Sequence, residues 1–109
     1  MVTKRIKNLN KVLREYRRKL QQRIKIRQVI LFGSYARGRP RDYSDVDLAI
    51  ISPDFEGGTK RDYLLLDRAA RDISPLIEAF PYTPRELKKR VKGDFLDEIL
   101  RTGKVVYQS

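Results

Sequence analysis

Two short stretches decide the fold: Val29-Ile30-Leu31-Phe32-Gly33-Ser34 and Asp45-Val46-Asp47-Leu48-Ala49-Ile50-Ile51. Each is rich in β-branched or large apolar residues, and each is ended by a strand breaker, Gly33 for the first and Pro53 for the second. This pattern is typical of buried β-strands. The first strand therefore leads directly into a turn, and the second carries two carboxylates near its beginning.

Further elements surround these two strands. Apolar residues at intervals of three and four predict a basic amphipathic helix within 4–22. Its apolar stripe consists of Ile6, Leu9, Leu13, Tyr16 and Leu20. After Gly33 and Ser34 we expect a single helical turn, closed by Gly38 and Pro40.

The second half of the chain continues the alternation of strands and helices. The first expected element is a helix capped by Thr59, with Tyr63, Leu66 and Ala70 on one face. A strand at 75–80 follows, and then a helix that runs from the capping box of Thr83 and Glu86 to about Lys92. The last two expected elements are a helix capped by Asp94 and a strand at 105–107. This order predicts one α+β (mixed αβ) domain over 1–109, with a basic helix at 1–24, a core at 25–109, and helices packed on a mixed sheet of three to four strands.

The composition limits the chemistry. The 109 residues include no Cys and no His, which excludes disulfides, thiolate zinc sites and a His-based catalytic triad. Any metal must therefore be bound by oxygen, which favours Mg²⁺ or Mn²⁺. The sequence contains no apolar segment of membrane-spanning length and no recognisable leader, so we expect a cytoplasmic protein without membrane contact.

The positive charge is concentrated at one end. Residues 1–27 contain eleven basic residues and one acidic residue, a net charge of +10 out of the formal +11. Such a helix suits an RNA backbone or an acidic protein, although a solvated helix face is the simpler interpretation. Only Tyr16 could stack on a base there, so RNA recognition by stacking has little support.

The turn at Gly33 and Ser34 could bind an anion. A glycine lets a ligand approach the backbone, and free N–H groups and a hydroxyl at the first turn of a helix are suited to phosphate. Three arginines follow in the same loop, Arg37, Arg39 and Arg41. Taken alone, the motif is better explained by an ordinary strand-to-helix turn with Ser34 as an N-cap.

The carboxylates strengthen the functional interpretation. Asp45 and Asp47 are two residues apart on a strand, so they share a face with Cα atoms roughly 6.6 Å apart. Unpaired, they would repel each other by about 4 kcal/mol at 4 Å and an effective dielectric of 20. A divalent cation removes this cost. Asp45 could instead belong to a solvated turn, but Asp47 lies between Val46 and Leu48.

A third carboxylate would complete a metal site. Glu78 stands alone in an apolar stretch, and it converges with the pair if its strand neighbours theirs. An exposed edge position is the alternative, and Asp72 is the competing candidate. Three carboxylates can hold two divalent ions about 3.5–4 Å apart, an arrangement that supports nucleotidyl transfer.

The two motifs together resemble a known signature. Gly33-Ser34, ten intervening residues and Asp45-Val46-Asp47 are similar to the signature of the DNA polymerase beta-like nucleotidyltransferase superfamily, and 31–38 with 44–48 resemble its minimal nucleotidyltransferases, often paired with a HEPN-domain toxin. The resemblance covers most of 26–107. It is more specific than a single glycine-rich loop.

The resemblance implies a reaction and a site. Asp45, Asp47 and Glu78 would be catalytic and would hold two Mg²⁺ or Mn²⁺ ions, and Gly33, Ser34 and the three arginines would bind the nucleotide. The implied activity is transfer of a nucleotide, AMP from ATP, to an acceptor hydroxyl with release of pyrophosphate. The third acid is often Asp in this superfamily, so Glu78 departs from the pattern.

Two other classes of function stay open. One is a non-catalytic antitoxin that neutralises a HEPN partner by binding, and the other is an RNA-binding adaptor that uses the basic helix. The acceptor could be a protein hydroxyl, an RNA end or a small molecule. Because the chain is short, we expect another chain or a second copy, as a homo-oligomer, to complete the acceptor site.

Overall fold

The computed structural model describes residues 8–38 and 45–109, which contain helices on both sides of one four-stranded sheet. In chain order the elements are α1 (Leu9–Gln21), β1 (Gln28–Phe32), β2 (Val46–Ile51), α2 (Lys60–Arg71), β3 (Ile77–Tyr82), α3 (Pro84–Lys88), α4 (Phe95–Thr102) and β4 (Lys104–Gln108). None of the helices in these residues is long and apolar enough to cross a membrane. The expected element order and the mixed α+β class are confirmed.

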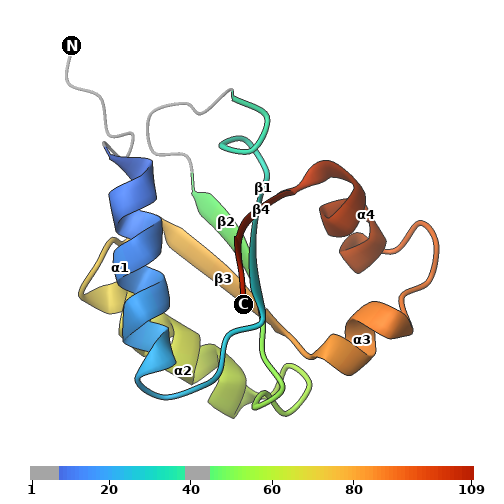
Figure 1. The fold of residues 1–109 in the computed structure, drawn as a ribbon, viewed down its shortest axis with the longest axis horizontal. Helices are drawn as coiled ribbons and strands as arrows, with labels where there is room; N and C mark the ends of the chain where they lie inside the picture. Colours follow the sequence, from blue (N-terminus) through green and yellow to red (C-terminus); the bar gives the residue numbers. More distant parts are fainter. Residues whose placement is uncertain (1–7, 39–44) are drawn as a thin grey trace.

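The sheet has the strand order β3-β2-β1-β4. β1 runs antiparallel to β2 and β4, whereas β2 and β3 are parallel and are joined by α2, because a parallel pair needs a crossover. Helices α1 and α2 cover one face of the sheet, and α3 and α4 lie on the other side (Figure 1). The sheet is therefore the middle layer of three.

Strand residues alternate between the two faces. Val46, Leu48 and Ile50 belong to the core under α1 and α2, whereas Ala49 and Ile51 pack with residues of α4. The two covering helices are also joined to each other, because the buried hydroxyl of Tyr16 donates a 3.0 Å hydrogen bond to the carbonyl of Leu66. By the same alternation Asp47, between Val46 and Leu48, faces the side of α3 and α4.

Several local expectations are confirmed. Thr59 and Thr83 accept hydrogen bonds from the N–H groups of Asp62 and Glu86 and cap α2 and α3, and Asp94 caps α4. Ile6 and the rest of 1–7 lie outside the described residues. The third strand was expected at 75–80 but forms two residues later, and it tolerates Pro81 because β3 is an edge strand.

The helix that starts at Thr83 is shorter than expected. It was predicted to reach Lys92 but ends at Lys88. The N–H of Val91 donates to the carboxylate of Asp94, and that of Gly93 donates to Asp97. These side-chain acceptors replace the helical hydrogen bonds, so the chain turns away.

Two local features differ from the simplest interpretation of the sequence. Tyr63, grouped with Leu66 and Ala70 on one face of α2, is 40% exposed, whereas Ala69 is buried beside Leu66. The single helical turn expected after Ser34 is absent from the described residues 33–38, which form turns with one helix-like hydrogen bond from the N–H of Arg37 to the carbonyl of Gly33.

Candidate active site

Two of the three carboxylates predicted to act together lie on neighbouring strands, and the third directly precedes one of these strands. Asp47 is paired in register with Glu78 on β3 and with Phe32 on β1. In-register residues of adjacent strands have side chains on the same face about 5 Å apart. Asp45 precedes β2 by one residue and is exposed. The condition set by the sequence, that the strand of Glu78 neighbours that of the aspartates, is therefore met.

The glycine of the turn is part of the same arrangement. Gly33 has a φ of 74°, and a Cβ placed on it would overlap Oδ2 of Asp47 and lie 3.2 Å from Cγ. The carboxylate of Asp47 therefore occupies space that only glycine leaves open. This contact joins the end of β1 to the carboxylate group.

The carboxylates influence one another. Partial burial raises the pKa of Asp47, and the charge of Asp45 raises it further, while Arg37 opposes both effects. Glu78 is exposed as a whole residue, but its carboxyl pKa is also raised, by burial first, then by a side-chain hydrogen bond with Asp45 and the charges of Asp45 and Asp47. Three acids therefore lie close together, and the nearby positive charge does not offset the cost of keeping all of them ionised.

The turn supplies neighbouring polar groups. Ser34 is half-buried, and its hydroxyl makes no hydrogen bond within the described residues. Arg37 is exposed and close enough to lower the pKa of Asp47. Arg39 and Arg41, expected to bind nucleotide, lie outside the described residues.

The competing acid Asp72 lies elsewhere. It follows the C-terminal end of α2 and is paired with Lys19 of α1. The hydrogen bond and charge of Lys19 lower the pKa of Asp72. Its carboxylate is thus engaged between the two helices, whereas Glu78 is in register with Asp47.

The donors suit a hard cation, although the side chains are not arranged as a ready ligand set. Among residues 8–38 and 45–109, no group of three or more His, Cys, Asp or Glu side chains is positioned to hold an ion. Asp45 is close enough to Glu78 to raise the pKa of its carboxyl, and Asp47 lies against Gly33. Asp47 and Glu78 nevertheless offer oxygen donors with raised pKa values, and Mg²⁺ or Mn²⁺ would stabilise their ionised form.

Comparison with known proteins decides the family. The profile of the nucleotidyltransferase domain matches residues 13–102. The chain belongs to the nucleotidyltransferase domain family. The matched region includes the turn at Gly33, the two aspartates and Glu78.

Relatives extend this assignment. A Methanocaldococcus jannaschii protein provisionally named a protein adenylyltransferase is 33% identical, covering 93% of this chain and 73% of the relative. A second from that organism, with the same kind of name, is 29% identical over 92% of this chain and 99% of its own. Protein adenylyltransferase MntA of Thermococcus cleftensis is 33% identical over 47% of this chain and 48% of its own. The resemblance to minimal nucleotidyltransferases is therefore confirmed.

Solved structures share the fold. A Sulfolobus solfataricus structure provisionally named a nucleotidyltransferase has a TM-score of 0.62 at 21% identity, covering 91% of this chain and 79% of its own. A toxin-antitoxin structure with AMP-PNP has a TM-score of 0.65 at 20% identity, covering 94% and 75%. Mutant MntA-HpeT toxin-antitoxin structures are similar in fold.

The sequence interpretation missed an aromatic cluster beside the carboxylates of this nucleotidyltransferase domain. The rings of Phe32, Phe80 and Phe95 lie with centroids 5.7 to 5.9 Å apart. Phe32 is in register with Asp47, and Phe80 is two residues after Glu78, so both share the carboxylate face. The two-residue spacing of Glu78 and Phe80 was visible in the sequence, but Phe95 joins the aromatic cluster only because α4 packs on this face. Phe95 remains 51% exposed.

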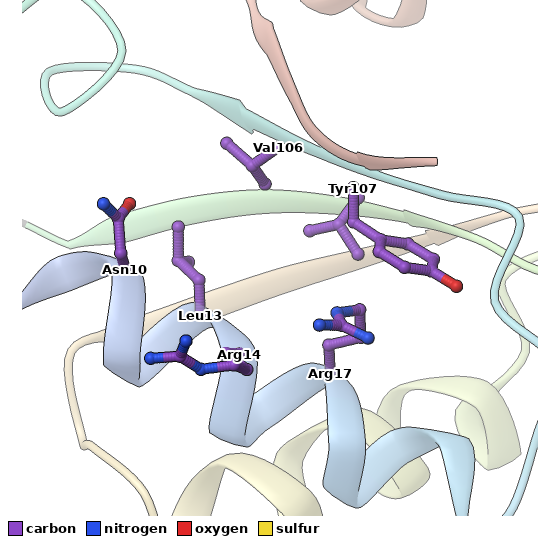
Figure 2. Close-up of a pocket in the computed structure, with 7 residues that line it drawn as sticks. Asn10, Leu13, Arg14, Arg17, Val106 and Tyr107 are labelled. Atoms are coloured by element: carbon purple, nitrogen blue, oxygen red, sulfur yellow. The ribbon is translucent and has the colours of Figure 1, made fainter. Parts of the chain in front are cut away.

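Several basic side chains of α1 contact other residues of the same chain. The guanidinium of Arg17 lies 4.2 Å from the ring centroid of Tyr107, beside a small hollow of about 170 Å³ between α1 and β4 (Figure 2). Lys11 pairs with Glu15 and Lys19 with Asp72. The described basic residues of α1 are therefore not a uniform free surface.

Proposed function

We propose that this chain transfers AMP from ATP to an acceptor hydroxyl and releases pyrophosphate. One observation carries the proposal: Asp47 is in register with Glu78 and in contact with Gly33, so the acids lie beside the turn that we propose binds the phosphates, in a nucleotidyltransferase domain. The provisional names of the relatives support protein adenylylation, AMP transfer to a protein hydroxyl. No part of this site requires Cys or His, which the chain lacks.

In this proposal the carboxylates bind metal ions, and the turn and its arginines bind the triphosphate. Asp45, Asp47 and Glu78 would hold two Mg²⁺ or Mn²⁺ ions, which supply charge stabilisation at the α-phosphate and the leaving pyrophosphate. Ser34 and Arg37, with Arg39 and Arg41, bind the triphosphate oxygens.

The bond changes are those of an in-line substitution. The acceptor oxygen forms a bond to the α-phosphorus, and the bond from that phosphorus to the bridging oxygen of pyrophosphate breaks. Glu78 takes the hydroxyl proton, because it is the acid of β3 in register with Asp47 and lies beside the proposed metal site. The gathered carboxylates thus serve binding and proton transfer together.

The exposed ring of Phe95 would stack against the nucleobase of ATP. It lies against Phe32 and Phe80, next to the carboxylate face, and leaves half of its surface free. Base stacking on an aromatic ring contributes about 1–3 kcal/mol. The ring is therefore positioned to hold the base while the turn holds the phosphates.

A binding function is the second candidate. The solved neighbours named as toxin-antitoxin structures support a partner toxin, which we propose is a HEPN-domain protein. In that case the chain neutralises its partner by contact. Asp47→Asn separates the candidates, because a purely binding antitoxin would still neutralise the toxin at full strength.

The test uses radiolabelled ATP. The chain is incubated with Mg²⁺ and ATP labelled at the α-phosphate, together with the protein that co-purifies with it, or with RNA. We expect label on the protein acceptor, lost with Asp47→Asn and kept with Asp67→Asn, which removes an exposed acid from α2. Label from the γ-phosphate instead would indicate phosphoryl transfer. No label on any acceptor would exclude the enzyme.

A further inference from the structure

A groove of about 600 Å³ lies where the C-terminal half of α1 meets α2. Residues of α1, the turn after it and α2 line it, and none of the three site carboxylates does. It is thus separate from the proposed nucleotide site.

The rim of the groove is positively charged. Five basic side chains line it and only one acidic side chain does: the basic ones are Lys19, Arg23, Lys60, Arg61 and Arg68. Lys19 is paired with Asp72, and Arg61 with Glu56 at 2.8 Å. The other three form no ion pair within the described part of the chain. Their charge is available to an acidic ligand.

The floor of the groove is apolar. Leu20 and Ala69 are buried at its base, Leu65 is half-buried, and Leu64 is 39% exposed among the cations. A nucleic-acid backbone gains nothing from exposed leucine, and none of the lining residues is an aromatic on which a base could stack. Packing another helix between α1 and α2 would cover this floor.

We propose that this groove binds an acidic amphipathic helix of a partner protein. The apolar stripe of that helix would lie on Leu64 and Leu65, and its carboxylates would face Arg23, Lys60 and Arg68. This is the helix-in-groove mode, in which apolar anchors give affinity and flanking charges set orientation. The carboxylate site stays uncovered, so the interaction does not depend on nucleotidyl transfer.

The probe is a designed 18-residue peptide with a leucine stripe at helical spacing and glutamates beside it. Its control is a peptide of the same composition with the stripe scrambled. Binding to the full chain is measured by fluorescence anisotropy at physiological salt. The stripe peptide is expected to bind at least tenfold more tightly than the scrambled one.

Matched variants locate the binding. Replacing Arg23, Lys60 and Arg68 by Ser is expected to weaken binding at least tenfold. Replacing Lys11, Arg14 and Arg18 by Ser removes equal charge from elsewhere on α1 and should change binding less than twofold. Leu64→Ser, which leaves the charge unchanged, should weaken it at least fivefold. Circular dichroism establishes that each variant is folded.

Several outcomes overturn the proposal. Equal losses in both triple variants, or equal binding of both peptides, would show attraction by overall charge alone. Absence of binding by either peptide would exclude the groove as a helix site. If a single-stranded RNA of equal charge bound through Arg23, Lys60 and Arg68 with no effect of Leu64→Ser, and displaced the peptide, the groove would be a nucleic-acid site instead.

Discussion

The carboxylate of Asp47 lies against the Cα of Gly33, in the space that a Cβ would occupy. Asp47 lies on β2, Gly33 directly follows the antiparallel strand β1, and Phe32, the last residue of β1, is in register with Asp47. The turn and the carboxylates are thus one structural unit, and a change in the turn should move a proposed catalytic side chain.

Replacing Gly33 by Ala tests this contact. Gly33→Ala introduces a left-handed alanine and displaces Asp47, whereas Gly58→Ala introduces similar strain, at a φ of 84°, with no atom within 4 Å of the new Cβ. Both should lose about 1–2 kcal/mol of stability in urea unfolding. Only Gly33→Ala should also lose at least tenfold in AMP transfer. Equal activity of the two variants would contradict the assignment.

Removing the charge of Asp47 should abolish transfer without cost to the fold. Burial and the charge of Asp45 raise its pKa, so the ionised form is disfavoured in the folded chain. Asp47→Asn removes this unfavourable charge, and the free energy of unfolding at pH 7 should stay constant or rise by up to about 1 kcal/mol. Urea unfolding measures it. A marked loss would show that Asp47 has a structural role.

Expectations that depend on neighbouring residues were the most successful. Thr83 and Glu86 form a capping box within four residues, and the close spacing of Asp45 and Asp47 lets the charge of Asp45 raise the pKa of Asp47. Such features follow from backbone periodicity and from hydrogen bonds between nearby groups. They could be predicted without knowing how the elements pack.

Features that depend on distant segments could not be predicted. The choice between Glu78 and Asp72 rests on the pairing of β2 with β3, which no local pattern encodes. The early end of α3 depends on acceptors supplied by Asp94 and Asp97, beyond the helix itself. The contact of Asp47 with Gly33 likewise requires the antiparallel pairing of β1 and β2.

Asp97 should make stability depend on pH. This buried carboxylate accepts a hydrogen bond from the N–H of Gly93 at 3.0 Å and pairs with Arg90 and Arg101. The Gly93 bond, helped by the charge of Arg101 and opposed by burial, lowers the pKa of Asp97. Its ionised form therefore stabilises the folded chain above about pH 4, and this contribution is lost as the pH falls through the folded pKa.

Asp97→Asn should accordingly lower the urea midpoint more at pH 7 than at pH 2. Glu98→Gln removes an exposed acid from the same helix and serves as the control. An equal difference between wild type and Asp97→Asn at both pH values would mean that packing, not charge, explains the loss.

The hydrogen bond between Tyr16 and Leu66 should contribute measurably to the packing of α1 on α2. Tyr16→Phe removes a buried donor and should lower the free energy of unfolding by about 1 kcal/mol. Tyr107→Phe removes a hydroxyl that accepts an exposed hydrogen bond from Gln21 and should change it by less than about 0.5 kcal/mol. If both variants lowered the free energy of unfolding equally, burial would not explain the contribution of the Tyr16 hydrogen bond.

Phe95 should matter for nucleotide binding more than for folding. Because the ring is half exposed, Phe95→Ala should cost little stability, whereas losing a stacking platform worth about 1–3 kcal/mol should raise the KM for ATP roughly 5- to 150-fold. Val91→Ala truncates another exposed apolar side chain and should leave KM unchanged. If Phe95→Ala instead raised only the KM of the acceptor, the ring would contact the acceptor, and the base would have to lie on another part of the carboxylate face.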